Sequence, residues 1–256
     1  MQDELKRFCR QFKFKRYFAG YIGIEREHFL VSPDGIYVPK AKEFLARIND
    51  TRWTYELSAC QVESRTTPHK DLKWIERELR ENEAKGNFEA VYMGLQLINA
   101  EVGDPQMPHD LYPDPRYLNI TKKASPEMVH AGCRVAGTHI HIGVRNMAHA
   151  IRVYNALIPH LDTFCYIGDH SNGERLRLYR AMAKYWKPEP LKNREHFFEI
   201  AKEQGFTDNP RNCWQLIRIS QHGTVELRMF GTAKHIEEIM GWIQIIQTIL
   251  NASMAA

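Results

Sequence analysis

Residues 20–31 read Gly-Tyr-Ile-Gly-Ile-Glu-Arg-Glu-His-Phe-Leu-Val, and apolar and polar side chains alternate in the middle of this stretch. Alternation with a period of two predicts a β-strand, because successive side chains of a strand point to opposite faces of the sheet. Glu25 and Glu27 are therefore expected on one face. The run Ser32-Pro-Asp-Gly35 that follows is a turn signal, so residues 36–38 are expected to fold back as a hairpin partner.

Three other stretches alternate in the same way, and each has one polar face. These faces carry Gln61, Glu63 and Arg65 in residues 55–66, His139 and His141 in residues 137–144, and Glu226 and Arg228 in residues 224–230. An antiparallel sheet with one face in water accounts for each strand taken singly. Taken together the strands favour a functional site, because a solvated face normally carries Lys, Thr, Ser and Gln, whereas these faces are rich in Glu, His and Arg.

Several carboxylates that face one another repel strongly unless a cation compensates them. A set of carboxylates with an occasional imidazole suits Mg²⁺ or Mn²⁺. Zinc is a poorer choice, because the chain has no His-Glu-x-x-His motif and no Cys-x-x-Cys pair. The strand faces therefore predict a site for Mg²⁺ or Mn²⁺.

The sequence contains neither a P-loop motif nor a Gly-x-Gly-x-x-Gly motif. If a nucleotide binds, metal ions and arginines must hold its phosphates. The candidates are Arg116, Arg175, Arg177 and Arg228. A surface charge is an equally good explanation for Arg116 and Arg175, whereas the place of Arg228 beside Glu226 favours a function.

Helical periodicity recurs between the strands. Apolar residues at three- and four-residue spacing predict helices that begin near residue 72, after a cap at Ser64, Thr66 or Thr67, and that span residues 148–166 and 236–250. The prolines of residues 103–115 predict an irregular loop over the surface or over a site. We expect an α+β fold with an antiparallel sheet backed by helices, in a single domain over residues 1–256.

Composition narrows the class of protein. The chain has 43% hydrophobic and 26% charged residues, which excludes collagen-like and wholly disordered chains. Five cysteines without a Cys-x-x-Cys pair fit no disulfide framework and favour a reducing compartment. A net charge of +4 is too small to argue for nucleic acid. The apolar stretch 239–250 is too short to cross a bilayer and the N-terminus has no secretory pattern, so we expect a cytoplasmic protein without nucleic-acid or membrane partners.

Five motifs occur in a recognisable order. They are residues 23–31, Glu56 with Glu63 ahead of Thr66-Thr67-Pro68, Pro115-Arg116-Tyr117, the run Gly137-Thr-His-Ile-His-Ile-Gly143, and Thr224-Val-Glu-Leu-Arg228. This order and approximate spacing resemble the glutamate–cysteine ligase-like carboxylate-amine ligases of the glutamine synthetase-like superfamily. The ending Val225-Glu-Leu-Arg-Met-Phe-Gly-Thr232 also resembles the small amidoligases of that superfamily.

The resemblance implies a curved antiparallel sheet that forms a funnel, with nucleotide and metal ions inside. It also implies that ATP phosphorylates a substrate carboxylate and that an amine then attacks the acyl phosphate. By similarity the ligands of two or three Mg²⁺ ions would be Glu25, Glu27, Glu56, Glu63, His139 and Glu226. Since Glu56 and Glu63 differ in strand parity, a bulge or bend is expected between them.

The resemblance also implies roles for arginines. Arg116, Arg177 and Arg228 would bind ATP, and Arg228 and Arg177 would take part in catalysis. The loop in which many relatives read Gly-x-x-Ser-x-Arg here reads Gly173-Glu-Arg-Leu-Arg177, without the serine. Contacts with substrate are predicted for His141, Arg65 and His222.

Three activities fit these residues. The first is an ATP- and Mg²⁺-dependent ligase that joins a small-molecule carboxylate to an amine, in a protein that could form homo-oligomers. The second is a phosphotransferase of the guanidino-kinase type on the same architecture. The third is a non-catalytic metal- or ligand-binding relative, for which a cation at Arg228 beside Glu226 would bring no advantage.

Overall fold

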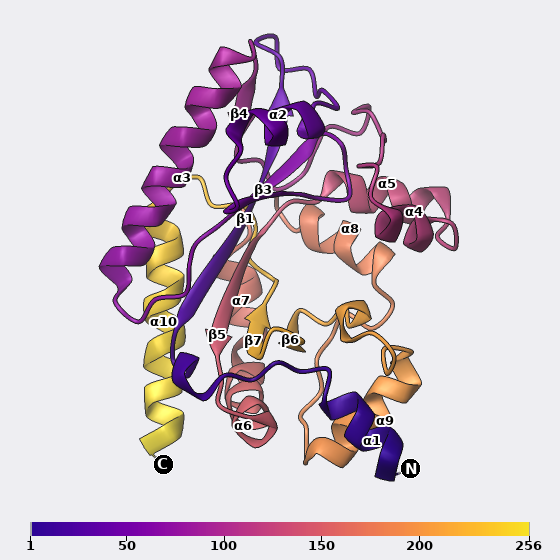
Figure 1. Cartoon of the computed structure of the whole chain (residues 1–256), viewed down its shortest axis with the longest axis vertical. Coiled ribbons are helices and arrows are strands. Elements are labelled where there is room, and N and C mark those ends of the chain that lie inside the picture. Colours follow the sequence, from indigo (N-terminus) through magenta and orange to yellow (C-terminus); the bar gives the residue numbers. More distant parts are fainter. Residues whose placement is uncertain (1, 256) are drawn as a thin grey trace.

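The computed structural model describes residues 2–255, which form a seven-stranded antiparallel sheet with helices on both faces (Figure 1). The strands are β1 (Ile22–Val31), β2 (Trp53–Tyr55), β3 (Gln61–Arg65), β4 (Gln96–Ile98), β5 (Thr138–Gly143), β6 (Ile217–Ser220) and β7 (Thr224–Leu227). Their order is β2-β3-β1-β5-β7-β6, and β4 pairs with the end of β1. The predicted α+β class with an antiparallel sheet backed by helices is confirmed.

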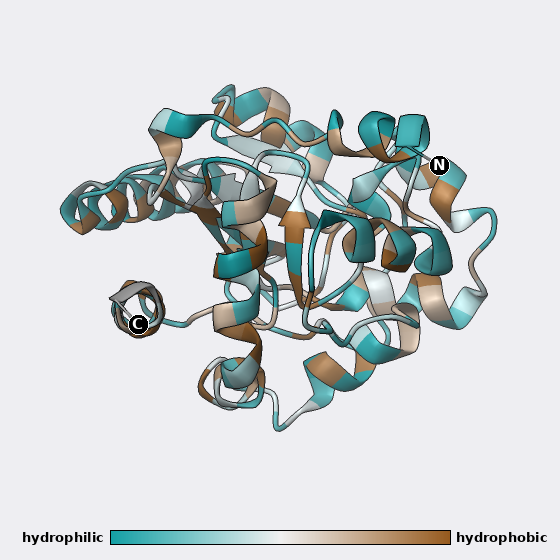
Figure 2. Cartoon of the chain, turned by 90° about the horizontal axis from the view of Figure 1, so that it is seen from below, coloured by the Kyte–Doolittle hydropathy of each residue, from teal (hydrophilic) through white to brown (hydrophobic). Residues whose placement is uncertain are grey.

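Ten α-helices lie within the described residues. They are α1 (Gln2–Cys9), α2 (Ala41–Ile48), α3 (Leu72–Tyr92), α4 (Pro115–Thr121), α5 (Pro126–Arg134), α6 (Met147–Leu157), α7 (Leu161–Ile167), α8 (Glu174–Met182), α9 (Arg194–Gln204) and α10 (Ile236–Ala255), with 3₁₀ turns η1 (Arg16–Phe18), η2 (Ile158–His160) and η3 (Pro210–Asn212). Figures 1 and 2 show α3 and α10 side by side at one side of the sheet, and Figure 1 shows α4, α5 and α8 on the other side. None of the helices within residues 2–255 combines the length and apolar composition that a membrane span requires.

The apolar face of the sheet follows from the strand register. Ile24 of β1 lies opposite Ile140 of β5, which lies opposite Leu227 of β7, which lies opposite Ile217 of β6. These four side chains are at most 1% exposed, and they belong to the same core cluster as Tyr154 of α6 and Ile243 of α10. Burial of each aliphatic side chain contributes about 1.5–3 kcal/mol to the free energy of folding. The period-two pattern thus places one face of every central strand in the core.

The predicted helices form, with differences at their ends. The N-cap of α3 is Asp71, whose carboxylate accepts a hydrogen bond from the N–H of Lys73 at 3.0 Å, rather than Ser64, Thr66 or Thr67. Thr66 instead uses its hydroxyl to accept a hydrogen bond from the N–H of Ile24, which ties it to the sheet. The helix expected over residues 148–166 is divided into α6, η2 and α7 at Pro159, which lacks an N–H group.

Residues 55–66 do not form the one strand that the alternation predicts. The chain leaves the sheet after Tyr55, turns over residues 56–60 and returns as β3, which pairs antiparallel with β2. The bulge or bend that we expected between Glu56 and Glu63 therefore takes the form of a turn that connects β2 to β3. Tyr37 forms an isolated bridge with Val31, so the predicted hairpin return after the turn at residues 32–35 is present in its shortest form.

Candidate active site

The register of the sheet brings the polar side chains of five strands together. Glu27 of β1 lies opposite Glu63 of β3, and Glu25 lies between Arg65 of β3 and His139 of β5. Residues directly opposite one another in an antiparallel pair have Cβ atoms about 5 Å apart. Further along, His141 of β5 lies opposite Glu226 of β7, which lies opposite Arg218 of β6. The polar stripe therefore crosses the sheet from β3 to β6.

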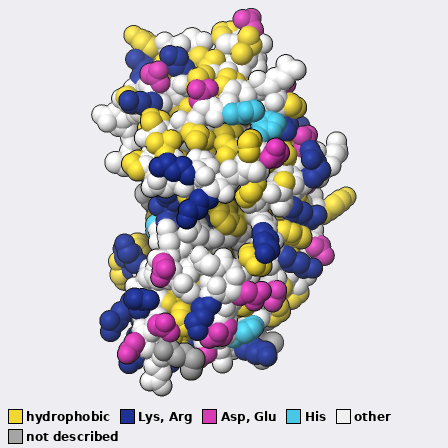
Figure 3. All heavy atoms as spheres, turned by 90° about the vertical axis from the view of Figure 1, so that its right-hand side faces the viewer, with side chains coloured by type: hydrophobic (Ala, Val, Ile, Leu, Met, Phe, Trp, Pro, Cys, Tyr) yellow, Lys and Arg dark blue, Asp and Glu magenta, His cyan; other side chains and the backbone are white. Residues whose placement is uncertain are grey.

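This stripe forms the floor of a cavity of about 260 Å³. Its walls come from α4, α5, α8 and the segment around η3, with apolar side chains that include Ile120, Met182 and Trp214. Figure 3 shows the face of the molecule on this side, where Lys and Arg side chains surround a recess near the centre. The loop before α4 is held by a stack of Tyr112 on Tyr55, with ring centroids 4.2 Å apart.

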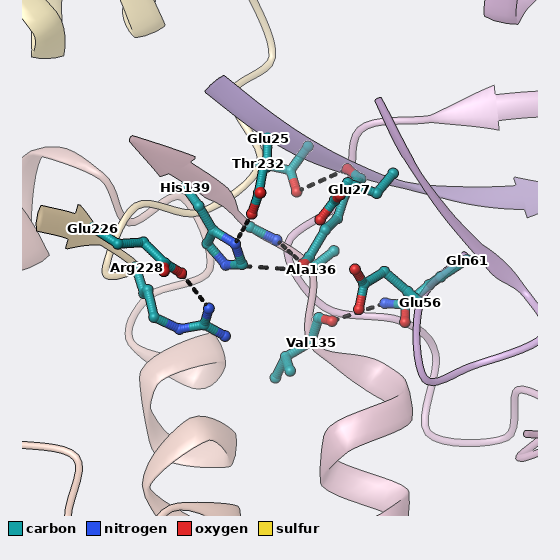
Figure 4. A network of polar contacts seen from close by, with 12 residues as sticks. Glu25, Glu27, Glu56, Gln61, Val135, Ala136, His139, Glu226, Arg228 and Thr232 are labelled. Atoms are coloured by element: carbon teal, nitrogen blue, oxygen red, sulfur yellow. Dashed lines mark hydrogen bonds and ion pairs between the residues drawn. The ribbon is translucent and has the colours of Figure 1, made fainter. Parts of the chain in front are cut away.

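Three overlapping groups of side chains in the cavity have the spacing of metal ligands. They are Glu25, His141 and Glu226; Glu25, Glu63 and His139; and Glu27, Glu56 and Glu63. Within each group, one ligand atom from each residue lies within 4.8 Å of the others. Figure 4 shows Glu25 and Glu27 of β1, Glu56 and His139 of β5 with their side chains directed toward one another. All six predicted metal ligands are thus in one cavity, together with His141.

The acidic group at the β1–β3 end is short of positive charge. Burial, with the charge of Glu56 as the next cause, raises the pKa of Glu27 to about 8. Burial and the nearby carboxylates of Glu25 and Glu56 also raise the pKa of Glu63 well above its ordinary value. One compensating contact is the hydrogen bond that Glu27 accepts from the N–H of Gly137 at 2.6 Å. A divalent cation at this point would supply the missing charge.

At the other end of the polar stripe, the imidazoles of His139 and His141 compensate the negative charge of the carboxylates. Burial opposes the ionisation of Glu25, but the charge of His141 and the hydrogen bond of His139 outweigh it and hold the pKa of Glu25 well below its ordinary value. Burial alone would lower the pKa of His141, yet the carboxylates of Glu25 and Glu226 raise it. Nδ1 of His141 is hydrogen-bonded to the hydroxyl of Thr224 at 2.9 Å. Its Nε2 is buried without a hydrogen-bond partner and lies 3.3 Å from an oxygen of Glu25.

These observations fit a divalent cation. An orphaned imidazole nitrogen beside a carboxylate oxygen is a ready ligand pair, and the mixture of carboxylates with few imidazoles matches hard cations such as Mg²⁺ and Mn²⁺. The ring of His141 is oriented by Thr224 in the manner typical of metal-binding histidines. His141, predicted as a substrate contact, therefore belongs with the candidate metal ligands.

Glu226 is fully buried and is held by two arginines. Arg218 donates from Nε and Nη2 to the two carboxylate oxygens at 2.7 and 2.9 Å, and Arg228 donates from Nη1 to Oε1 at 2.5 Å. Burial penalises the charge of Glu226, but the two guanidinium groups and His141 outweigh it, so the pKa of Glu226 lies far below its ordinary value. Besides the two arginines, Glu226 has His141 as a neighbour, whose Nε2 lies 4.0 Å from Oε2 of Glu226.

The other predicted residues divide into two sets. Arg116, Arg65, His222 and Arg228 all line the cavity, and Nε of Arg116 is buried without a partner. Arg177 does not line it: its side chain is 69% exposed on α8 and lies 3.7 Å from Glu174. The roles predicted for Arg177 in ATP binding and catalysis are therefore at odds with its position. Arg175 reaches the cavity instead, but it donates to the backbone carbonyls of Ala136, Met229 and Arg228.

Sequence reasoning missed Arg218 and gave no role to Tyr117. The hydroxyl of Tyr117 donates to Glu56 at 3.4 Å. Arg218 could have been found, because Ile217 to Ser220 alternates and is joined to β7 by a three-residue turn that ends at Gly223, with φ +79°. Such a hairpin places Arg218 opposite Glu226.

Two known proteins with similar sequences carry the name of the enzyme family that the motifs resemble. The chain is 30% identical over 145 residues to "Putative glutamate–cysteine ligase 2-2" of Mycolicibacterium vanbaalenii, which covers 55% of this chain and 39% of that protein. It is 22% identical over 265 residues to "Putative glutamate–cysteine ligase 2-1" of Rubrobacter xylanophilus, which covers 94% of this chain and 69% of that protein. No known family model matches the chain.

A solved structure shares the fold. The bifunctional glutathione synthetase from Pasteurella multocida superposes with a TM-score of 0.56 and 11% identity, over 99% of this chain and 41% of that one. The match therefore covers less than half of the length of that protein and of the first relative above. The resemblance that the motifs indicate is thus confirmed: the chain is related to proteins named "Putative glutamate–cysteine ligase" and shares its fold with that glutathione synthetase.

Proposed function

We propose that this protein is an ATP- and Mg²⁺-dependent carboxylate-amine ligase. The observation that carries the proposal is the convergence of Glu25, Glu27, Glu56 and Glu63 with two histidines in one cavity, next to an arginine that is fixed by a buried carboxylate. The names of the curated relatives and the resemblance of the motifs support the same activity.

In this proposal, one set of residues binds the divalent ions and another set, the arginines, binds phosphate groups. Glu25, Glu27, Glu56, Glu63, His139, His141 and Glu226 would hold the divalent ions. Such ions neutralise the charge that develops on phosphate oxygens during transfer. Arg228 is oriented by Glu226 and by Tyr179, whose hydroxyl accepts from its Nε at 3.3 Å, so its free guanidinium edge can hold the transferred phosphoryl group. Arg116 has an unpartnered Nε in the cavity and would bind a phosphate of ATP.

The reaction proceeds in two displacements. An oxygen of the substrate carboxylate attacks the terminal phosphorus of ATP, a new P–O bond forms, and the bond to the bridging oxygen breaks to release ADP. The amine nitrogen then attacks the carbonyl carbon of the acyl phosphate, the C–N bond forms, and phosphate leaves while the amine proton passes to solvent. Arg65 and His222, which line the cavity, would contact the substrates.

Hydroxylamine tests this activity without knowledge of the natural amine, since it converts an acyl phosphate to a hydroxamate, which forms a coloured complex with Fe³⁺. We expect hydroxamate and ADP to form together when the protein receives Mg²⁺, ATP and the right member of a panel of amino acids. A guanidino-kinase type of phosphotransferase would instead accumulate a stable phosphorylated compound. Absence of Mg²⁺-ATP binding by calorimetry would refute both activities.

The variant Arg228→Ala should lower turnover by about 100-fold or more while Mn²⁺ still binds, because Arg228 acts on the transferred group and not on the ions. The matched control is Arg194→Met, at an exposed arginine on α9 that pairs only with Glu195 among the described residues. Unchanged turnover in Arg228→Ala would remove Arg228 from the mechanism.

A further inference from the structure

Arg218 connects two parts of the cavity that are separate in the sequence. Two of its three nitrogens form a fork on both oxygens of Glu226. The third, Nη1, donates to the backbone carbonyls of Cys213 at 2.9 Å and Arg211 at 3.3 Å. Its side chain is 14% exposed. Four of the five N–H groups of the guanidinium therefore donate to protein, and each of its three nitrogens makes at least one such bond.

The segment 210–214 that Arg218 holds contributes to the cavity wall. Pro210, Arg211 and Trp214 line the cavity, and the segment is short and largely irregular around η3. A second chain of hydrogen bonds reaches the same segment: the hydroxyl of Tyr179 donates to the carbonyl of Trp214 at 2.9 Å and accepts from Nε of Arg228. Both arginines that hold Glu226 are thus tied to this segment.

A fork of two parallel N–H···O bonds fixes the plane of a carboxylate in a way that a point charge does not. With the plane of Glu226 fixed, Oε2 lies 4.0 Å from Nε2 of His141, and these two residues form a candidate metal group with Glu25. Loss of the fork would leave the carboxylate held from one side by Arg228 alone. The direction of Glu226 therefore depends on Arg218.

We propose that Arg218 is a positioning residue that fixes the Glu226 carboxylate toward the metal ligands and couples it to the segment 210–214, so that ion binding orders this wall of the cavity. This inference rests on the proposed function for the identity of the ion. The clamp between Glu226 and the segment is independent of it, since the hydrogen bonds are present without an ion.

The metal test uses Mn²⁺ titrations of the whole chain with the variants Arg218→Met and Arg218→Lys. Removal of a positive charge would by itself tighten Mn²⁺ binding, whereas loss of an orienting partner weakens it, typically by about 10- to 100-fold. We expect both variants to bind Mn²⁺ about tenfold or more weakly, because lysine restores the charge but not the fork. Full rescue by lysine, or tighter binding in Arg218→Met, would overturn the inference.

The coupling test uses Glu226→Gln as the second member of a double-mutant cycle. If Arg218 acts through Glu226, then Arg218→Met should change the Mn²⁺ affinity of the Glu226→Gln protein by no more than about twofold. A full additional loss in that background would mean that Arg218 acts on the fold in general, and would contradict the proposal.

Hydrogen exchange of residues 211–214 tests the clamp without any metal. Arg218→Met removes two hydrogen bonds to the segment, so its exchange should rise by about tenfold, and Glu226→Gln should raise it as well because the anchor of Arg218 is weakened. Asn209→Ala removes the acceptor of the hydrogen bond that the N–H of Arg211 donates, and should loosen the segment while the fork on Glu226 stays in place. Because coupling is reciprocal, its Mn²⁺ affinity should fall, but by less than in Arg218→Met. If wild-type protein binds no Mn²⁺, the proposed function fails, and the exchange data alone show whether Arg218 holds the segment 210–214. Unchanged exchange in Arg218→Met would refute the clamp.

Discussion

Glu27 shows how a single side chain reports on its surroundings. It lies opposite Glu63 across the β1–β3 pair, close to Glu56, and its nearest donor is a backbone N–H. Burial, and after it the neighbouring carboxylates, raises the pKa values of Glu27 and Glu63, so these groups cost free energy of folding in a protein that lacks a compensating cation. Stability and metal affinity are therefore opposed at this position.

The variant Glu27→Gln should make this opposition visible. Its amide oxygen can still accept from Gly137. A neutral amide avoids the cost that Glu27 has on folding at neutral pH, where it must either take up a proton or bury a charge, so the metal-free protein should gain about 1–3 kcal/mol in free energy of unfolding. The same variant should bind Mn²⁺ more weakly. Urea denaturation in a chelator and Mn²⁺ titration measure the two effects, with exposed Glu195→Gln as control. A destabilised metal-free variant would argue against charge crowding.

His149 provides a test of stability against pH away from the cavity. It is 8% exposed on α6, and its Nδ1 accepts a hydrogen bond from the N–H of Arg145 at 3.1 Å. Burial, then the charges of Arg145 and Arg152, lower the pKa of His149 below its ordinary 6.5. The unfolded chain therefore binds a proton below about pH 6.5 that the folded chain does not, and stability falls as pH falls through that range.

We expect His149→Asn to flatten this dependence, since an amide oxygen can accept the same hydrogen bond and does not titrate. The wild-type protein should lose up to about 1.4 kcal/mol more per pH unit than the variant below pH 6.5, and the two curves should run parallel above it. Urea midpoints across the pH range measure this. Parallel curves at all pH values would show that His149 is protonated equally in both states.

At the scale of elements, the packing of α3 on the sheet depends on Gly86. A Cβ at this position would lie 2.5 Å from the ring of Trp53 on β2 and 2.9 Å from Leu97 on β4. The helix therefore approaches the strands closely only because residue 86 has no side chain. The other long helix, α10, contains Gly241, around which an added Cβ would meet no atom within 4 Å.

These two glycines form a matched pair. Gly86→Ala should destabilise the protein by about 1–3 kcal/mol, since overpacking of the interface outweighs the gain in helix propensity. Gly241→Ala should stabilise it by about 0.5–1 kcal/mol, because only the propensity changes. Thermal or urea unfolding distinguishes the two directions. Equal effects at both positions would mean that α3 can shift away from Trp53 at little cost.

At the scale of the whole molecule, ion binding should appear as stability. The candidate ligands come from β1, the turn after β2, β3, β5 and β7, so an ion would join segments from most of the sheet. A ligand at 100 times its dissociation constant stabilises the folded state by about 2.7 kcal/mol, which corresponds to about 5–10 °C in melting temperature for a chain of this size.

We therefore expect Mn²⁺ to raise the melting temperature of wild-type protein and of Glu195→Gln equally, and to raise that of Glu63→Gln far less. Glu63 belongs to two of the three candidate metal groups, whereas Glu195 is exposed on α9. Differential scanning calorimetry with and without Mn²⁺ gives the comparison. An equal rise in melting temperature in all three proteins would mean that Mn²⁺ binds outside the cavity that Glu63 lines.

Local patterns were sufficient for the faces of the strands. Period two assigns Glu25 with Glu27, His139 with His141 and Glu226 with Arg228 to a polar side, and a strand turns by half a revolution per residue whatever its neighbours are. The same periodicity misled over residues 55–66, where a turn interrupts the pattern. In the run Gly173 to Arg177 the chain begins α8, and two residues apart on a helix do not face the same way, so Arg175 is buried while Arg177 is exposed.

The sequence by itself determined the α+β class, the polar faces and the residue types of the candidate site, because these depend on alternation and composition within short segments. Only the tertiary structure decided that Glu27 lies opposite Glu63, that Nε2 of His141 is left for a ligand, and that Arg218 holds Glu226 together with the segment 210–214. Those relations depend on strand register and on contacts between distant segments, which the free energy of the whole folded chain sets and no local pattern specifies.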